Sequence, residues 1–142
     1  MKTYDPKKVI VIVGGAYITG FSPDSVVGVS RNSDNYKLVV GADGEGTRSR
    51  TNDRSGQITI SLMQTSASNA VLSGYAIDDE QANAGVVPVT VTDLNGATLY
   101  QADQAWVKKP PKGDHGKEAK TREWILETDT LLWFEGGNLV SG

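Results

Sequence analysis

The chain has 142 residues, a length that fits one domain of ordinary size. Its 17 acidic and 14 basic side chains give a formal charge of −3, which argues against a protein that wraps nucleic acid electrostatically. The absence of cysteine excludes disulfides and thiol chemistry, and the single histidine excludes a multi-histidine metal site. The 34 Val, Ile and Thr residues, against 9 Leu, together with 16 Gly favour a mainly β domain.

The first strongly apolar segment is Val9–Val13, five consecutive β-branched residues that end at Gly14-Gly15. It is far shorter than the roughly 20 residues that a membrane helix needs, and no signal-peptide cleavage pattern follows it. We therefore expect a buried strand and no membrane partner. A second strand is expected before Val29, with the corner Gly20–Pro23 between the two strands.

A hairpin with an unusually long tip is predicted next. Its strands are Tyr36–Val40 and the strictly alternating Gln57–Leu62, and residues 41–56 between them are polar and rich in glycine. Ordinary hairpin loops have about 2–5 residues. The long tip is either a flexible surface loop or an arm that becomes ordered against another subunit. In the second case the candidate inter-subunit contacts are Asp43, Glu45, Arg48, Arg50, Asp53 and Arg54.

One helix is predicted over Ser66–Gln81, with Ser66 or Ser68 as its N-cap and Gly85 as its stop signal. Its apolar residues fall at helical spacing, so we expect it to cover one face of a sheet.

The second half of the chain predicts further strands. Val87–Thr92 alternates, Asn95-Gly96 indicates a tight hairpin turn, and Ala97–Val107 is the returning strand. The last strand pair or bent strand is Thr121–Phe134. The whole pattern predicts a single domain over residues 1–142, a small mainly β barrel or sandwich with one flanking α-helix and the long-tipped hairpin.

No constellation of catalytic residues is found. Gly15 and Gly20 have the spacing of a phosphate loop, but Phe21 stands where that loop requires lysine. The pair Asp43 and Glu45 lacks the other oxygen ligands of a calcium loop. We therefore assign no catalytic, cofactor-binding or metal-binding residue and expect no cofactor.

Two functions from other classes stay open. Trp106, Trp124 and Trp133 are expected mainly in the core, but on an exposed face they would indicate a β-sandwich that binds carbohydrate. An enzyme would have to be a hydrolase with paired carboxylates, because cysteine is absent and no nucleophile turn accompanies His115.

Four segments of the second half occur in a familiar order: Pro88–Gly96, Ala105–Pro111, Thr121–Trp124 and Gly136–Asn138. Their order and spacing resemble the small tail tube proteins of contractile-tailed phages. The N-terminal strands, the long hairpin and the start of the helix fit as well, so the resemblance covers nearly the whole chain. No single motif is chemically specific.

The resemblance implies a barrel fold shared with the tube protein of type VI secretion. It implies six-membered rings that stack into a hollow tube inside a contractile sheath and conduct DNA at infection, without catalysis or cofactor. The implied partners are the chain itself and the tail sheath, baseplate and tail terminator proteins. The implied location is the virion tail, after assembly in the host cytoplasm. Another barrel component of the tail or baseplate, or the tube of a contractile bacteriocin, are the related alternatives.

A conduit for DNA should not bind its cargo, and phosphate contacts with Lys and Arg are what create affinity. Six copies of this chain, each at −3, carry a net charge of −18. We therefore expect Arg48, Arg50 and Arg54 to face neighbouring subunits rather than the bore. The candidates for the lumen are short polar side chains that alternate with apolar ones: Gln57, Thr59, Ser61, Thr90 and Thr92.

Overall fold

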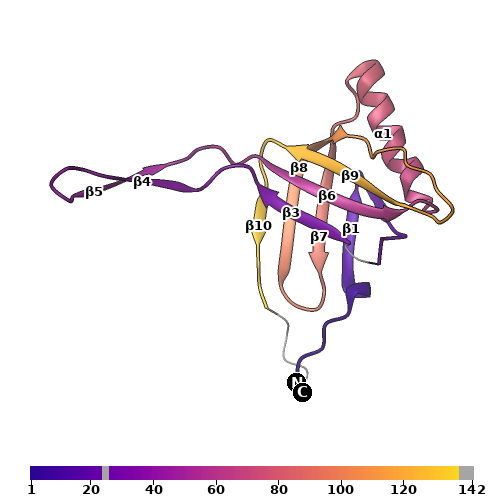
Figure 1. The fold of residues 1–142 in the computed structure, drawn as a ribbon, viewed down its shortest axis with the longest axis horizontal. Coiled ribbons are helices and arrows are strands. Elements are labelled where there is room, and N and C mark those ends of the chain that lie inside the picture. The colour runs from indigo at the N-terminus through magenta and orange to yellow at the C-terminus, as the bar shows by residue number, and fades with distance from the viewer. Residues whose placement is uncertain (24–25, 138–142) are drawn as a thin grey trace.

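The computed structural model describes residues 1–23 and 26–137, and its main element is a sheet of eight strands (Figure 1). The strand order is β2-β1-β7-β8-β9-β6-β3, and β10 pairs with β8 beside this path. The elements are a 3-10 turn at Pro6–Lys8, β1 (Val9–Val13), β2 (Ala16–Ile18), β3 (Val27–Arg31), β4 (Tyr36–Val40), β5 (Gly46–Arg50), β6 (Gly56–Met63), α1 (Ser68–Ala82), β7 (Val87–Asp93), β8 (Thr98–Lys109), β9 (Thr121–Thr128) and β10 (Leu132–Phe134).

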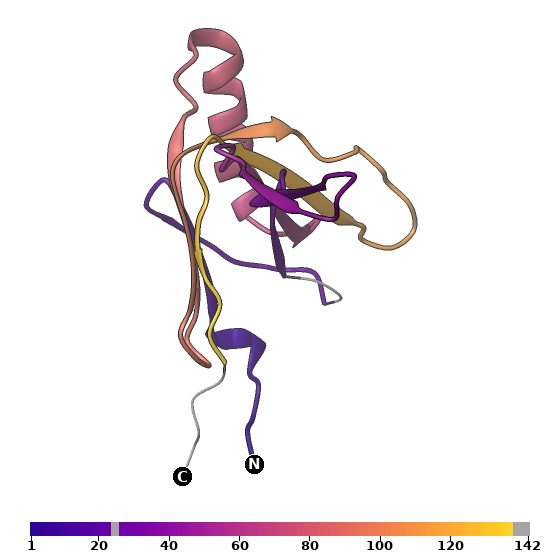
Figure 2. The same ribbon diagram turned by 90° about the vertical axis from the view of Figure 1, so that its left-hand side faces the viewer.

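The sheet folds over on itself at β8, its longest strand. One half of β8 pairs with β7 and β10, and the other half pairs with β9. Register shifts interrupt the ladder between Val87 and Val89 on β7 and between Val107 and Lys109 on β8, and such irregularities bend and twist a sheet. Figure 2 shows the result, with β7 and the first part of β8 in one layer and the end of β8 turning over toward β9.

The core lies between the two layers. Strands β1 and β7 contribute alternating buried valines, such as Val13 and Val89, and β6 contributes Ile58, Ile60 and Leu62, all at most 1% exposed. Burying one such side chain contributes about 1.5–3 kcal/mol. The predicted mainly β, sandwich-like fold is thus confirmed. The end strands β2 and β3 do not pair with each other, so the sheet formed by the described residues is not a closed barrel.

The predicted helix is confirmed, although its ends differ from the expectation. The N-cap position is Ala67, and the backbone N–H of Ser68 donates to Oγ of Ser66 (3.2 Å). The helix ends at Asn83, which adopts a left-handed conformation at φ 52°, and not at Gly85. Leu72 packs into the core, and the Tyr75 hydroxyl donates to the carbonyl of Val13 (3.3 Å), so α1 covers one edge of the sandwich.

The pairing predicted for the long hairpin is wrong. Strand β4 pairs with β5 in a separate two-stranded sheet, with Val40 opposite Gly46. Strand β6, predicted as its partner, instead lies between β3 and β9 in the main sheet. Residues 46–50 were expected to be part of the tip and are a strand, and the turn between the strands has only five residues, 41–45.

The turn at Asn95 is wider than predicted. Asp93 pairs with Thr98, so four residues connect β7 and β8, and neither Asn95 nor Gly96 adopts the positive φ of the tight turn. Instead, Asn95 is buried: its amide donates to the carbonyl of Asp5, and its Oδ1 accepts from the Asp5 backbone N–H, both at 2.9 Å. The asparagine fastens the N-terminal segment to the hairpin.

We predict that Gly85→Ala destabilises the fold by about 1–3 kcal/mol, because its Cβ would overlap the Tyr75 carbonyl oxygen and lie 2.5 Å from the Asp79 Cβ. The control is Gly74→Ala at the exposed centre of α1, where a Cβ meets nothing within 4 Å. That change should stabilise by about 0.5–1 kcal/mol. Urea unfolding of dilute protein measures both, and equal midpoints for the two variants would contradict the packing.

Candidate assembly surfaces

The most distinctive surface of the molecule is the hairpin β4–β5, called the arm below. It projects away from the sandwich, and all ten of its strand residues are exposed (Figure 1). An isolated two-stranded hairpin is marginally stable in water, and stable ones need a packed face. The arm therefore has the character of an element that another surface covers.

The far end of the arm is a well-ordered turn. The Gly41 N–H donates to the carbonyl of Glu45 (2.8 Å), and Oδ1 of Asp43 accepts from the Glu45 N–H (3.1 Å). Gly44 has φ of 87°, a conformation that glycine adopts without a steric penalty. The predicted contact residues Asp43 and Glu45 thus stand at the end of the arm, away from the arginines.

The two faces of the arm differ in chemistry. Cross-strand pairing puts Leu38 opposite Arg48 and Tyr36 opposite Arg50, so one face carries the apolar row Tyr36, Leu38 and Val40 beside two arginines. The Arg48 guanidinium lies over the Tyr36 ring at 4.0 Å from its centroid. We call this the arginine face. The opposite face carries Lys37, Val39, Thr47 and Ser49.

The root of the arm is tied to the sandwich at several points. The Asn32 N–H donates to the carbonyl of Ser55 (3.0 Å), and the Leu131 N–H donates to the carbonyl of Arg54 (2.8 Å). An Nη2 hydrogen of Arg31 donates to the carbonyl of Leu131 (2.6 Å). These bonds join the end of β3, the segment before β6 and the start of β10, and they fix where the arm leaves the body.

Asp53 is part of this root. Its carboxylate accepts from the Ser55 hydroxyl (2.6 Å), the Ser33 hydroxyl (2.7 Å) and the Ser55 backbone N–H (2.9 Å). These donors lower the pKa of Asp53 from 3.8 to about 2, with the Ser55 hydroxyl as the largest cause. Asp53, predicted as an inter-subunit contact, thus already has partners within its own chain.

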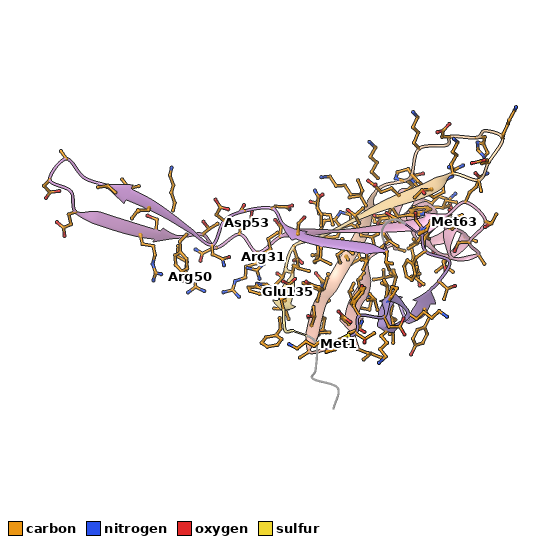
Figure 3. All side chains as sticks on the ribbon, turned by 60° about the horizontal axis from the view of Figure 1, so that its bottom comes forward. Met1, Arg31, Arg50, Asp53, Met63 and Glu135 are labelled. Atoms are coloured by element: carbon orange, nitrogen blue, oxygen red, sulfur yellow. The ribbon has the colours of Figure 1, made fainter. Side chains whose placement is uncertain are left out.

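Three arginines converge beneath the root. Arg31, Arg50 and Arg54 line a cavity of about 230 Å³ together with Tyr36 and Trp133. Figure 3 labels Arg31 and Arg50 beside this root, with Asp53 close by. In residues 1–23 and 26–137 the only ion pair is Lys108–Glu127, so none of the three guanidiniums has a carboxylate partner there. Nε of Arg31 is buried without any hydrogen-bond acceptor.

A second cavity, of about 420 Å³, adjoins the first and shares Arg31 and Trp133 with it. It contains a short hydrogen bond from the Tyr100 hydroxyl to Oε1 of Glu135. Burial and this carboxylate raise the pKa of Tyr100 to about 12, so the hydroxyl stays protonated and donates. Glu135 is therefore engaged inside the chain.

The five lumen candidates lie on two different outer faces. Gln57, Thr59 and Ser61 alternate on β6 with the buried core residues, but Ser61 is itself only 7% exposed. Across the ladder they pair with Glu127, Ile125 and Glu123 of β9. This outer face of β6 and β9 therefore carries polar side chains and two glutamates, but Ile125 lies between the glutamates and Glu127 is in an ion pair with Lys108 (3.2 Å).

Thr90 and Thr92 lie on the outer face of the other layer. Their neighbours on β1 are Ile12 and Ile10, and Thr92 also lies opposite Leu99 of β8. Their surroundings are therefore more apolar than the sequence pattern indicated. The structure brings Thr90 and Thr92 together but does not place them beside the β6 residues.

The tryptophans do not form one exposed face. Trp124 is 3% exposed and donates its indole N–H to Asn69 of α1 (2.9 Å), whereas Trp133 is exposed beside the root arginines. The described residues contain no group of three or more His, Asp or Glu side chains that could hold a metal ion. Among the helices formed by the described residues, none has the length and apolarity needed to span a membrane.

The sequence pattern does not indicate that Arg31, Trp133 and the apolar row of the arm belong to one surface. A signal for the second strand of the arm was present, because Thr47-Arg48-Ser49-Arg50 alternates hydroxyl and guanidinium side chains with period two. Of the predicted contacts, the structure brings together Arg50 and Arg54 at the root cavity, with Arg48 farther along the arm.

We predict that Asp53 titrates near pH 2 and that Ser33→Ala moves its pKa toward 3.8, since one donor to the carboxylate is lost. The folded pKa is depressed, so the contribution of this carboxylate to stability is present above about pH 4 and is lost as the pH falls toward 2. Carboxyl NMR measures the titration. Ser49→Ala, which keeps all three donors, is the control, and an equal shift in both variants would contradict the assignment.

Comparisons with known proteins agree with this architecture. The family model described as the bacteriophage PhiTE tail tube protein matches residues 2–132. "Structural protein ORF10" of Pseudomonas phage KPP10 is 34% identical over 144 residues, which cover 96% of this chain and 83% of that protein.

Solved structures show the same fold at low sequence identity. The anti-feeding prophage tube-terminating cap has a TM-score of 0.66 at 12% identity, over 96% of this chain and 93% of that one. Two structures of the PVC extracellular contractile injection system are similar at 16% identity. Its sheath/tube terminator has a TM-score of 0.65 over 95% of this chain and 99% of that one. A chain of its sheath–tube complex has a TM-score of 0.63 over 93% of this chain and 91% of that one. From the match over residues 2–132, the chain belongs to the PhiTE tail tube protein family and is a structural component of a phage virion.

Proposed function

We propose that this protein forms the inner tube of a contractile tail. Six copies make a ring, rings stack into a hollow cylinder inside the sheath, and the cylinder conducts DNA when the phage infects. Membership of the tail tube family does not specify the number of subunits in a ring or the cargo of the tube, and the proposal supplies both. The working form is an assembly, and no catalytic step is part of it.

The observation that carries the proposal is the exposed arm. Tyr36, Leu38 and Val40 are 44%, 67% and 58% exposed, in one row, on an element that none of the other described residues covers. Monomeric proteins seldom expose such rows without a partner. In an assembly a neighbouring subunit would bury this row. The burial would stabilise the hairpin fold of the arm as well as the contact between the subunits.

The ends of the main sheet support the same arrangement. Strands β2 and β3 end the main path of the sheet, β10 pairs only with β8, and edges with free backbone groups pair readily with strands of another molecule. In a ring, β2 of one subunit and β3 of the next can continue the sheet. Sheets that are open in the single chain would then be joined into the continuous wall of the ring.

The bore is proposed to be lined by the outer face of β6 and β9. Gln57 lies there opposite Glu127, which is in an ion pair with Lys108, and Thr59 lies opposite Ile125. The face therefore offers mainly hydroxyl and amide groups to a polyanion, with Glu123 as a further carboxylate. Such a surface offers phosphates few cations to bind, because Lys108 is paired with Glu127, and DNA can slide past it. Thr90 and Thr92, beside isoleucines, then remain as the second candidates.

The proposed partners are other copies of the chain, the tail sheath, the baseplate and the tail terminator. The similar solved structures include a sheath–tube complex and two terminators. Because the fold is common to tubes and terminators, a terminator is the second candidate function. Copy number in purified particles separates the two, since a tube subunit occurs in every ring along the tail and a terminator only at its end.

We predict that purified protein forms tubes and that a variant without the arm does not. In this variant Asn-Gly replaces residues 38–48 and closes a tight turn between the paired Lys37 and Ser49. The body should unfold at an unchanged temperature, because none of the removed side chains belongs to the core. Negative-stain microscopy and light scattering measure assembly. Normal tubes from the shortened chain would refute the role of the arm.

We also predict that a cryo-EM map of the tube shows Gln57 and Thr59 toward the bore and Arg48, Arg50 and Arg54 at subunit contacts. Electrophoretic retardation should detect no DNA binding by intact tubes at physiological salt. A bore lined mostly by Lys and Arg would contradict the proposed conduit.

A further inference from the structure

We propose that the arginine face of the arm docks on the outer face of helix α1 of a second copy of this chain. The inference rests on the proposed tube function and names the surfaces that join neighbouring subunits. In this contact the acidic C-terminal end of α1 lies at the root of the arm, and the first turns of the helix lie under the apolar row. The argument follows from the shape, polarity and charge of the two surfaces.

The outer face of α1 is unusual for a helix that meets water. Its exposed stripe begins with Ala70, Gly74 and Ile77 and ends in the polar Gln81, and Ile77 is 50% exposed. Helices facing solvent normally carry charged or polar residues at such positions. Gly74 has open space around its Cα, so the helix presents a smooth, partly apolar strip to which a hairpin can approach closely.

The acidic residues of α1 lie near its C-terminal end, where a helix is least favourable for carboxylates. Asp78 and Glu80 are exposed in the last turn, no basic residue accompanies them there, and the C-terminal end of a helix is already its negative end. Cations from another molecule would relieve this unfavourable arrangement. Asp79 is different, because it accepts from the backbone N–H of Gly85 within the chain (3.4 Å).

The arm supplies cations at the matching position. Arg50 and Arg54 line the root cavity, Arg48 lies two ladder pairs farther out, and no described carboxylate is in an ion pair with any of them. The unpartnered Nε of Arg31 lies at the same root. Arg50 and Arg54 lie at the root, Arg48 stands opposite Leu38, and only Val40 of the apolar row lies beyond the arginines. The cations are thus concentrated in the root half of the arm, as the carboxylates are at one end of the helix.

The two surfaces also match in length. The row from Tyr36 to Val40 spans about 13 Å at about 3.3 Å per residue. The helix from Ala70 to Glu80 spans about 15 Å at 1.5 Å per residue. Figure 1 shows the arm and α1 on opposite sides of the body, so an arm docks on another copy rather than on its own chain. Such a contact is heterologous and generates rings or stacks.

Charge reversal tests the contact in the full-length chain. Arg50→Glu should raise the critical concentration for tube formation at least about tenfold, whereas Lys37→Glu, the same reversal on the opposite arm face, should leave it within about twofold. The double variant Asp78→Arg/Glu80→Arg should assemble as poorly as Arg50→Glu. Combining Arg48→Glu/Arg50→Glu with Asp78→Arg/Glu80→Arg should restore tubes. Pelleting and microscopy give the critical concentration, and unfolding curves of dilute protein confirm that each variant folds.

The outcomes separate this inference from the proposed function. If the wild-type chain makes no tubes, the proposed function fails. If it makes tubes and Arg50→Glu assembles as readily as Lys37→Glu, only the arm–helix contact is overturned. The contact is also overturned if the combined reversal assembles no better than the arm reversal Arg48→Glu/Arg50→Glu alone.

Cross-linking gives a second, independent measurement, because the chain contains no cysteine. With Leu38→Cys and Gly74→Cys in one chain, a short bismaleimide should produce a ladder of covalent oligomers from assembled tubes. The matched control combines Gly74→Cys with Val39→Cys, which lies on the opposite face of the arm and should give much weaker laddering. Equal ladders from the two variants, or none from Leu38→Cys tubes, would overturn the contact.

Discussion

The fold depends on the bend of one long strand. Strand β8 pairs with β7 and β10 at one end and with β9 at the other, and the register shifts beside Val87 and Val107 let the sheet turn between them. Without this turn the valines of β1 and β7 would be exposed to water and would not pack against Ile58, Ile60 and Leu62. The bend therefore makes the core, and it also leaves β2 and β3 as separate ends of the main path, with β10 as a further edge strand beside β8.

The same bend determines where the arm stands. Strand β3 is held on β6, β6 is held on β9, and the arm leaves the body at the point where these strands end. The bonds around Arg31, Arg54 and Leu131 stiffen that point. A hairpin with no core of its own can thus keep a defined direction. For an assembly this matters, because a contact made by an oriented arm loses less conformational entropy than one made by a flexible loop.

Much of the sandwich could be predicted from the sequence, and the arm could not. Strands such as Gln57–Leu62 bury one face, and burial imposes the alternation that identifies them. All five residues of the strand Gly46–Arg50 are exposed, so no apolar alternation marks it and glycine and serine suggest a loop. At Asn95 the tight-turn pattern failed for a different reason. The Asn95 side chain donates to Asp93, two residues before it, and also bonds the backbone of Asp5, and the local sequence contains no information on this second, long-range contact.

Hydrophobic patterning predicts which residues a single chain buries. Surfaces that a neighbouring subunit covers depart from this pattern. Here two elements depart from it in opposite ways: β4 exposes an apolar row on a strand without a core, and α1 exposes Ala70, Gly74 and Ile77 on a helix that should be polar outside. One surface ends in arginines without ion-pair partners among the described residues, and the other ends in carboxylates at the negative end of a helix. Each departure is unfavourable in the monomer, and each offers what the other lacks. Two such complementary surfaces on opposite sides of one molecule are the minimum that head-to-tail assembly requires.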